Sequence, residues 1–230
     1  SDGPGQTVFE GVDLIIKRGE KVAFVGKNGE GKSTLVKCIM GEIPFDGNLK
    51  IGHNVQIGYF AQNQAQLLDE SLTIFETIDQ VAKGDMRLKI NDLLGAFMFG
   101  GETSEKKVKV LSGGERSRLA MIKLLLEPVN LLILDEPTTY LDICHQLEVL
   151  ELVSKLNREE NITIIMVLHD INQAVRYSSE IFVLENGIIE RQGTPIDVMT
   201  HDAIADIFEV DADVEMRRGR PSISINGLLD

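Results

Sequence analysis

The chain has 230 residues, enough for one large domain or two small ones, and its 43% hydrophobic and 26% charged residues are typical of a globular protein and exclude wholesale disorder. Its 23 basic and 36 acidic residues give a net charge of −13, which argues against a protein that binds duplex nucleic acid by charge. The two cysteines are far apart, which excludes a disulfide-stabilised secreted scaffold, and the apolar runs are too short to cross a bilayer, so we expect a cytoplasmic protein.

Short apolar runs alternate with amphipathic segments along the chain. This alternation predicts an α/β fold around a parallel sheet. An Asn-Gly pair at 186–187, flanked by apolar runs, predicts a hairpin. In chain order, we expect strands at 22–25, 54–60, 131–134, 162–168, 181–184 and 188–191, and helices at 34–40, 67–94 with a break at Gly84, 115–127, 146–156 and 171–177.

The sharpest motif is GKNGEGKST at residues 26–34, between a predicted buried strand and a predicted helix. It fits the phosphate-loop (Walker A) pattern, in which glycines let backbone N–H groups surround phosphate oxygens. Lys32 is expected to reach the β- and γ-phosphates of a nucleotide, and Ser33 to bind Mg²⁺. The motif predicts a nucleotide site formed by Asn28, Gly29, Glu30, Gly31, Lys32, Ser33 and Thr34.

Two carboxylates follow the predicted strand at 131–134, in the manner of a Walker B motif. Alternation along a strand sends neighbouring side chains in different directions. We therefore expect Asp135 to face the Mg²⁺ shell and Glu136 to face the attacking water.

Leu-Ser-Gly-Gly-Glu-Arg at 111–116 opens the helix predicted at 115–127, which makes a second anion-binding helix start. With these motifs in this order, residues 5–210 resemble the ATP-binding-cassette (ABC) ATPases, whose signature is LSGGE or LSGGQ. The resemblance implies a P-loop NTPase fold of ABC type: a mixed, mainly parallel sheet flanked by helices, an α-helical subdomain and a small antiparallel β part. It further implies one domain, with a nucleotide-binding core at 1–64 and 129–230 and a helical subdomain at 65–128.

The resemblance also implies roles for individual residues. Glu136 matches the catalytic glutamate that acts as a general base on water, and His169 matches the switch histidine that contacts the γ-phosphate. Gln62 matches the glutamine loop, which senses Mg²⁺ and the γ-phosphate. The signature residues Ser112, Gly113 and Gly114 match those that contact ATP on the opposite subunit, and Asp142 matches an aspartate that links two sites across a dimer.

These roles imply Mg²⁺-dependent ATP hydrolysis, with Lys32, Gln62, Glu136 and His169 as the catalytic group and Ser33, Gln62 and Asp135 as the metal-binding group. Because Ser112–Gly114 has no evident use within one monomer, we expect ATP to drive a head-to-tail homodimer with two composite sites. His53, His145, His201, Cys38 and Cys144 are expected to be structural.

One family feature is missing. ABC ATPases usually stack adenine on an aromatic residue about twenty residues before the phosphate loop, and the equivalent position here is near Asp2. Phe9, the first aromatic residue, lies where a core residue is expected. Base stacking is worth about 1–3 kcal/mol, so we expect ATP binding to be weakened roughly tenfold or more, with poor base selectivity.

The two parts of the chain resemble different subfamilies. With IGYFAQ at 57–62, LLGAF at 93–97 and VLSGGERSR at 110–118, residues 5–138 are similar to the ribosome-associated ABC-F ATPases. With TYLDI at 139–143, QLEVLEL at 146–152, VLHDINQA at 167–174 and GTP at 193–195, residues 139–210 are similar to the ATPases of iron-siderophore and cobalamin importers. Residues 1–140 hold 16 basic and 19 acidic side chains, and residues 141–230 hold 7 and 17, so their net charges are −3 and −10. The hypothesis that follows is an engineered chimera joined near 135–138.

We consider four functions from the sequence and favour the first. The first is an ATPase domain without an intact physiological partner, and the second is the energising subunit of an importer that docks on a membrane permease. The third is a fragment of a ribosome-associated translation factor, and the fourth is a nucleotide-gated binding module that does not hydrolyse ATP. None of these requires sequence-specific binding of nucleic acid.

Overall fold

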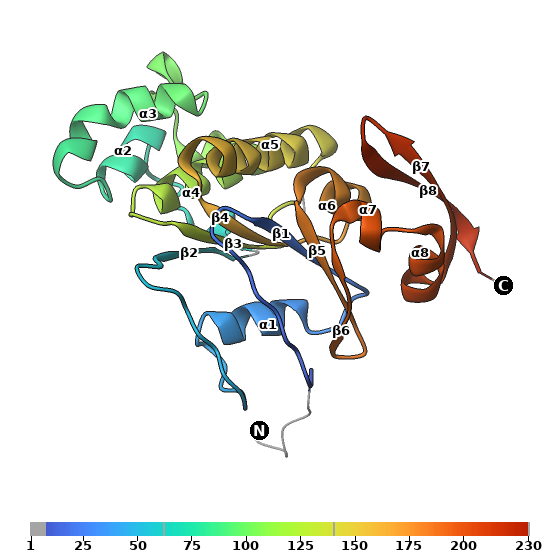
Figure 1. Cartoon of the computed structure of the whole chain (residues 1–230). Coiled ribbons are helices and arrows are strands. Elements are labelled where there is room, and N and C mark those ends of the chain that lie inside the picture. Colours follow the sequence, from blue (N-terminus) through green and yellow to red (C-terminus); the bar gives the residue numbers. More distant parts are fainter. Residues whose placement is uncertain (1–7, 62, 140, 230) are drawn as a thin grey trace, which may run out of the picture.

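A six-stranded sheet with helices on both faces forms the centre of the protein (Figure 1). The structure is a computed structural model that describes residues 8–61, 63–139 and 141–229, without the side chains of residues 85, 86 and 89. Within these residues, no helix combines the length and the apolar character needed to cross a membrane.

The strands lie in the order β2-β3-β4-β1-β5-β6. Every neighbouring pair is parallel except β5 and β6, which form the antiparallel hairpin expected around the Asn-Gly turn. The sheet is therefore mixed and mainly parallel, as predicted. Each strand overlaps an expected one: β1 (Lys21–Val25), β2 (Ile57–Phe60), β3 (Leu131–Asp135), β4 (Thr163–Val167), β5 (Glu180–Glu185) and β6 (Ile188–Gly193).

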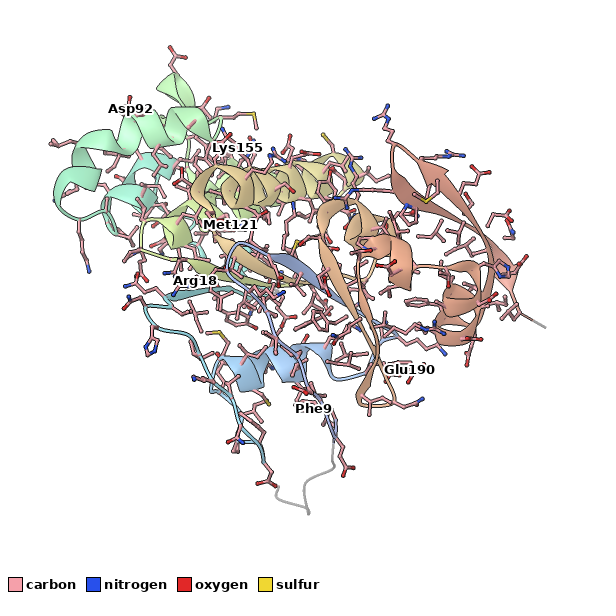
Figure 2. All side chains as sticks on the ribbon, viewed as in Figure 1. Phe9, Arg18, Asp92, Met121, Lys155 and Glu190 are labelled. Carbon is pink, nitrogen blue, oxygen red and sulfur yellow. The ribbon has the colours of Figure 1, made fainter. Side chains whose placement is uncertain are left out.

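Alternate side chains of β1 supply two separate cores. Val22 and Phe24 pack on the face covered by α1 (Lys32–Ile39), and Phe9 packs against the same cluster, as expected for a core residue (Figure 2). Ala23 and Val25 pack into the larger cluster on the other face. Because helices cover both faces, the central strands are continuous apolar runs. The helices of the larger cluster include α4 (Gly113–Leu125), α5 (Ile143–Glu160) and α6 (Ile171–Tyr177).

The segment at 67–94 differs from the prediction, because several short helices replace one interrupted helix. A capping box between Thr73 and Glu76 starts a helix at Ile74, several residues after the expected start. The break at Gly84 is confirmed, since this glycine has a φ of 55°. The segment contains α2 (Ile74–Asp79), α3 (Ile90–Ala96) and the 3₁₀ helices Gln64–Leu67 and Gly84–Lys89; two further 3₁₀ helices, Gly101–Glu105 and Val108–Val110, precede α4.

The C-terminal region contains the small antiparallel β part that the resemblance implied, at strands that the sequence analysis did not locate. A two-stranded antiparallel sheet, β7 (Val210–Arg217) with β8 (Arg220–Leu228), packs on α8 (His201–Phe208), which follows the short α7 (Pro195–Val198). Figure 1 shows this hairpin at the opposite end of the view from α2 and α3.

Phe24 offers a direct test of the α1-side core. Its ring is fully buried and meets that of Phe182 edge-on, with centroids 5.8 Å apart. Phe24→Ala should lower the free energy of unfolding by about 3–5 kcal/mol, because the lost ring leaves a cavity. Urea unfolding followed by circular dichroism measures the change. Ile15→Ala is the control, since Ile15 is 78% exposed, and equal losses for the two variants would contradict the described core.

Candidate nucleotide site

The phosphate loop connects the end of β1 to the start of α1, as the motif predicted. Gly26 has a φ of 147°, and a side chain at this position would collide with the backbone carbonyl of Leu184 on β5. Only glycine fits there, which explains the first residue of the motif. Gly31 is the N-cap of α1, so the first free N–H groups of this helix are at Lys32, Ser33 and Thr34.

Lys32 is held inside the loop. Its Nζ donates hydrogen bonds to the carbonyl oxygens of Gly26 at 2.8 Å and Lys27 at 2.6 Å, and the residue is only 5% exposed. Burial lowers the pKa of Lys32, whereas nearby carboxylates, Glu136 foremost, oppose that shift. The loop therefore concentrates a lysine side chain and helix N–H groups in one place, which suits phosphate.

Ser33 and Asp135 meet although they are far apart in sequence. The Ser33 hydroxyl donates to Oδ1 of Asp135 at 2.8 Å, and Asp135 is buried at the end of β3. A hydroxyl and a carboxylate are hard oxygen ligands, and Mg²⁺ commonly combines one or two carboxylates with phosphate oxygens and water. The pair fits a Mg²⁺ ion of this kind. Among the described residues no group of three or more His, Cys, Asp or Glu could hold a metal unaided.

Tyr59 is a site residue that the sequence analysis missed. Its hydroxyl donates to Oδ2 of Asp135 at 3.1 Å, so both carboxylate oxygens of Asp135 are engaged. Burial and the neighbouring carboxylate raise the pKa of Tyr59. The contact depends on the parallel pairing of β2 with β3, in which Tyr59 is the register partner of Ile133. A strand prediction alone does not say which strands are neighbours.

Glu136 follows β3 and contacts a different set of groups from Asp135, as strand alternation predicted. Oε1 of Glu136 lies 2.7 Å from Nε2 of His169, and the Thr139 hydroxyl donates to Oε2 at 3.3 Å. His169 comes just after the end of β4, next to β3 in the sheet. Glu136 has a φ of 52°, a left-handed conformation that costs a non-glycine residue roughly 1–3 kcal/mol. Two of the four predicted catalytic side chains, Glu136 and His169, therefore contact each other directly.

The signature residues lie at the start of α4, where Ser112 is the N-cap. Its hydroxyl accepts from the N–H of Glu115 at 3.2 Å, and the Glu115 carboxylate accepts from the N–H of Ser112 at 2.8 Å. This capping box gives Ser112 a use within a single chain, so the premise of the dimer argument was wrong. No hydrogen bond or ion pair between described residues joins 112–114 to the phosphate loop at 26–34.

His145 links Asp142 to the signature. Nδ1 of His145 lies 2.7 Å from Oδ2 of Asp142, and Nε2 lies 3.3 Å from the Ser112 hydroxyl. The imidazole ring packs so closely on Gly114 that a side chain there would overlap it. His145 therefore connects two segments that the sequence analysis treated separately, although a histidine three residues after a helix N-cap aspartate was a usable signal. Asp142 caps α5 by accepting from the N–H of His145 at 3.0 Å.

Some predicted site residues lie outside this geometry. Gln62 is outside the described residues, as is the position near Asp2 where an adenine-stacking aromatic was expected. Asn28, Gly29 and Glu30 lie in the phosphate loop, and Thr34 lies in the first turn of α1. The structure thus brings together Lys32, Ser33, Asp135, Glu136 and His169 through the elements that follow β1, β3 and β4.

Comparison with known proteins identifies the family of the chain. The family described as "ABC transporter" matches residues 9–139, more than half of the chain. The chain belongs to the ABC transporter family. Relatives named as import ATP-binding proteins agree with this assignment, so the chain is an ATP-binding cassette of the ABC ATPase class, and the resemblance is confirmed at the level of fold and enzyme class.

Relatives of two kinds are similarly close. ABC transporter F family member 5 of Arabidopsis thaliana is 41% identical over 80% of this chain, which spans 26% of that relative. Petrobactin import ATP-binding protein FpuC of Bacillus anthracis is 37% identical over 93% of the chain, which spans 85% of it. Alignments of this coverage must both cross residues 135–138. The expected chimeric junction is therefore not supported.

A solved relative supports the fold. The dimeric structure of MJ0796, described as a bacterial ABC transporter cassette, has a TM-score of 0.67 and 27% identity to this chain. The match covers 81% of this chain and 90% of that one.

The pKa shifts of the tyrosines can be measured by absorbance. The chain has three tyrosines and no tryptophan, and burial raises the pKa of Tyr177 to about 12 and that of Tyr59 further. At pH 11 the folded chain should therefore show the phenolate absorbance of at most one tyrosine, and the chain in guanidinium that of all three, because unfolded tyrosines ionise near pH 10. Since the folded state retains these protons, stability should fall as pH rises above about 10.

The variant Tyr59→Phe assigns the signal. It should leave the folded absorbance at pH 11 unchanged and lower the unfolded absorbance by about one third, because one of three phenols is gone. A drop in the folded signal would show that Tyr59 ionises normally and that its contact with Asp135 is absent.

Proposed function

We propose that the chain hydrolyses ATP to ADP and phosphate at the site formed by Lys32, Ser33, Asp135, Glu136 and His169. One observation carries this proposal: Asp135 and Glu136, neighbours at the end of β3, contact two different partners. Asp135 lies 2.8 Å from the Ser33 hydroxyl, and Glu136 lies 2.7 Å from His169. A metal-binding pair and an acid–base pair are thereby placed side by side.

The phosphate loop binds and orients the nucleotide. The N–H groups at residues 28–34 surround the β- and γ-phosphates, and the Lys32 ammonium exchanges its carbonyl partners for phosphate oxygens. Phosphoryl transfer depends mainly on positioning and on stabilising charge, and this loop supplies both. When bound at Ser33 and Asp135, Mg²⁺ supplies further charge neutralisation on the phosphates, and Gln62 is proposed to complete this shell.

Glu136 acts on the attacking water as general base, and His169 positions the Glu136 carboxylate. The carboxylate already accepts from Thr139 and contacts His169, so its orientation is fixed by two neighbours. During the reaction the His169 imidazole contacts the γ-phosphate while Glu136 receives the proton of water. General base catalysis contributes about 10²–10⁴-fold in rate.

A second copy of the chain completes the site. We propose that Ser112, Gly113 and Gly114 contact ATP bound to the partner, and that Asp142 lies at the interface with His145 behind it. One support is the N-terminus of α4, a helix of thirteen residues that begins with the sequence Ser-Gly-Gly, where an anion can bind. The other is that the related cassette MJ0796 was solved as a dimer.

The physiological partner is a separate question from the reaction. The siderophore-import and ABC-F relatives have similar sequence identity to the chain. The ATPase is therefore compatible with a role as the permease-bound subunit of an importer and with a role as a ribosome-associated factor. The predicted helical subdomain at 65–128 is the part through which either partner is proposed to dock.

The reaction is tested by Glu136→Gln and Lys32→Ala. Glu136→Gln should lower the Mg²⁺-dependent release of phosphate from ATP by about 10²-fold or more, because it removes the general base. Lys32→Ala should weaken ATP binding as well, since it removes the charge that faces the phosphates. Glu159→Gln is the matched control, because Glu159 lies in an exposed pair with Lys155. Wild-type turnover in the Glu136 variant would refute the assigned base.

The dimer is tested by sedimentation of Glu136→Gln with saturating ATP and Mg²⁺. This variant should hold ATP without hydrolysing it and should sediment as a dimer, whereas the same variant with ADP should sediment as a monomer. A strict monomer at saturating ATP would contradict the composite site while leaving the single-chain geometry intact.

A further inference from the structure

A second polar pocket lies at the amino end of β1, opposite the phosphate loop. It has a volume of about 390 Å³ and is formed by the start of β1, α5, the end of α6 and the start of β8. Figure 1 shows α6 between α5 and the β7–β8 hairpin. The five residues of β1 separate this pocket from the phosphate loop by roughly 13 Å, at about 3.3 Å per residue.

The pocket is strongly basic in a protein that is strongly acidic. Four cationic side chains and one carboxylate line it, while the whole chain carries a net charge of −13. The carboxylate, Glu151, already accepts from the Tyr177 hydroxyl at 2.8 Å and from Arg176 at 3.2 Å. The charged lining residues are Lys21, Glu151, Arg158, Arg176 and Arg220.

Lys21 lies at the base of the pocket and its charge is poorly compensated. Its Nζ donates to the hydroxyl of buried Ser154 at 2.7 Å, a neutral partner. Burial and then the positive charges of Arg158 and Arg220 lower the pKa of Lys21 to about 8, with Glu151 opposing the shift. A bound anion would relieve both the burial and the repulsion.

Two arginines complete the pocket in different ways. Arg220 is fixed by backbone carbonyls at the end of α6, since its Nη1 donates to those of Val175 and Ser178, the latter at 2.9 Å. The guanidinium of Arg158, on α5, makes no hydrogen bond or ion pair with the side chain or backbone of any described residue. The pocket therefore contains the Arg220 guanidinium, which is held in place, and the Arg158 guanidinium, which has no hydrogen-bonding partner among the described residues. Both lie near Lys21, whose charge is not paired with a carboxylate.

We propose that this pocket binds a phosphate monoester of a small soluble molecule, with Lys21, Arg158 and Arg220 as its phosphate ligands. Guanidinium groups match phosphate oxygens bidentately, and the Ser154 hydroxyl can turn its proton toward the ligand. The volume lies near the lower end of the range for small-molecule sites, so it accommodates a phosphate with a short organic group.

The test is calorimetric titration of the full chain carrying Lys32→Ala, which disables the phosphate loop, with glycerol 3-phosphate and with inorganic phosphate at constant ionic strength. One equivalent of glycerol 3-phosphate should bind, and adding Arg158→Gln should weaken binding at least fivefold. Lys155→Gln is the matched control, because it removes one positive charge from the same helix outside the pocket, where the side chain is 53% exposed (Figure 2). Thermal unfolding of each variant verifies folding.

The pH dependence provides a second readout, with sulfate as a probe whose charge is constant. The groups that line the pocket with Lys21 are Glu151 and Arg158 of α5, Arg176 and Tyr177 of α6, and Arg220 of β8. Because Lys21 loses its proton near pH 8, affinity for sulfate should fall roughly tenfold between pH 7 and pH 9. Lys21→Met should bind sulfate more weakly and without this dependence.

Three outcomes would overturn the proposal. One is the absence of binding, and another is an equal loss of affinity in the Arg158 and Lys155 variants, which would indicate only the general field of the protein. The third is co-sedimentation with phosphatidic acid vesicles without binding of glycerol 3-phosphate, which would identify a lipid headgroup instead of a soluble ligand.

Discussion

Parallel pairing of three central strands is the constraint on which the nucleotide site depends. β4 lies between β3 and β1, and because all three run in the same direction, their carboxyl ends share one edge of the sheet. The phosphate loop follows β1, the two acidic residues end and follow β3, and His169 follows β4. Residues separated by more than a hundred positions, such as Ser33 and Asp135, therefore meet at this edge. The apolar side chains on both faces of these strands stabilise the pairing, so the packing of the core also fixes the positions of the site residues.

The parts of the site that could be predicted are those in which a motif lies next to its own strand or helix. Lys32 and Ser33 follow from the loop pattern, and the divergence of Asp135 from Glu136 follows from the alternation of a strand. Tyr59 could not be predicted in this way, because its contact with Asp135 needs the knowledge that β2 lies beside β3. The same holds for the contact between Glu136 and His169. The sequence indicated both residues as catalytic, but it did not indicate that they contact each other.

The errors in the fold have physical causes. Apolar spacing over 67–94 indicated helix but did not show where helices begin, which the Thr73–Glu76 capping box decides locally. The hairpin at 210–228 did have a signal, because Val210, Ala212 and Val214 alternate with acidic residues as an amphipathic strand requires. This strand lies after the last of the nucleotide-binding motifs. In the signature, Ser112 followed three residues later by Glu115 is also the sequence pattern of a capping box, so the cap within one chain was predictable.

Asp142 serves two neighbours, and this sharing has a mechanical consequence. One carboxylate caps a helix of eighteen residues and also holds the imidazole that touches Ser112. An interaction that pulls the Asp142 carboxylate away would leave the His145 N–H at the start of α5 without its hydrogen bond. It would also break the contact that holds the His145 ring. Docking at this loop must therefore disturb the helix cap and the His145 contact together, and amide protection at the start of α5 would report whether the cap is intact.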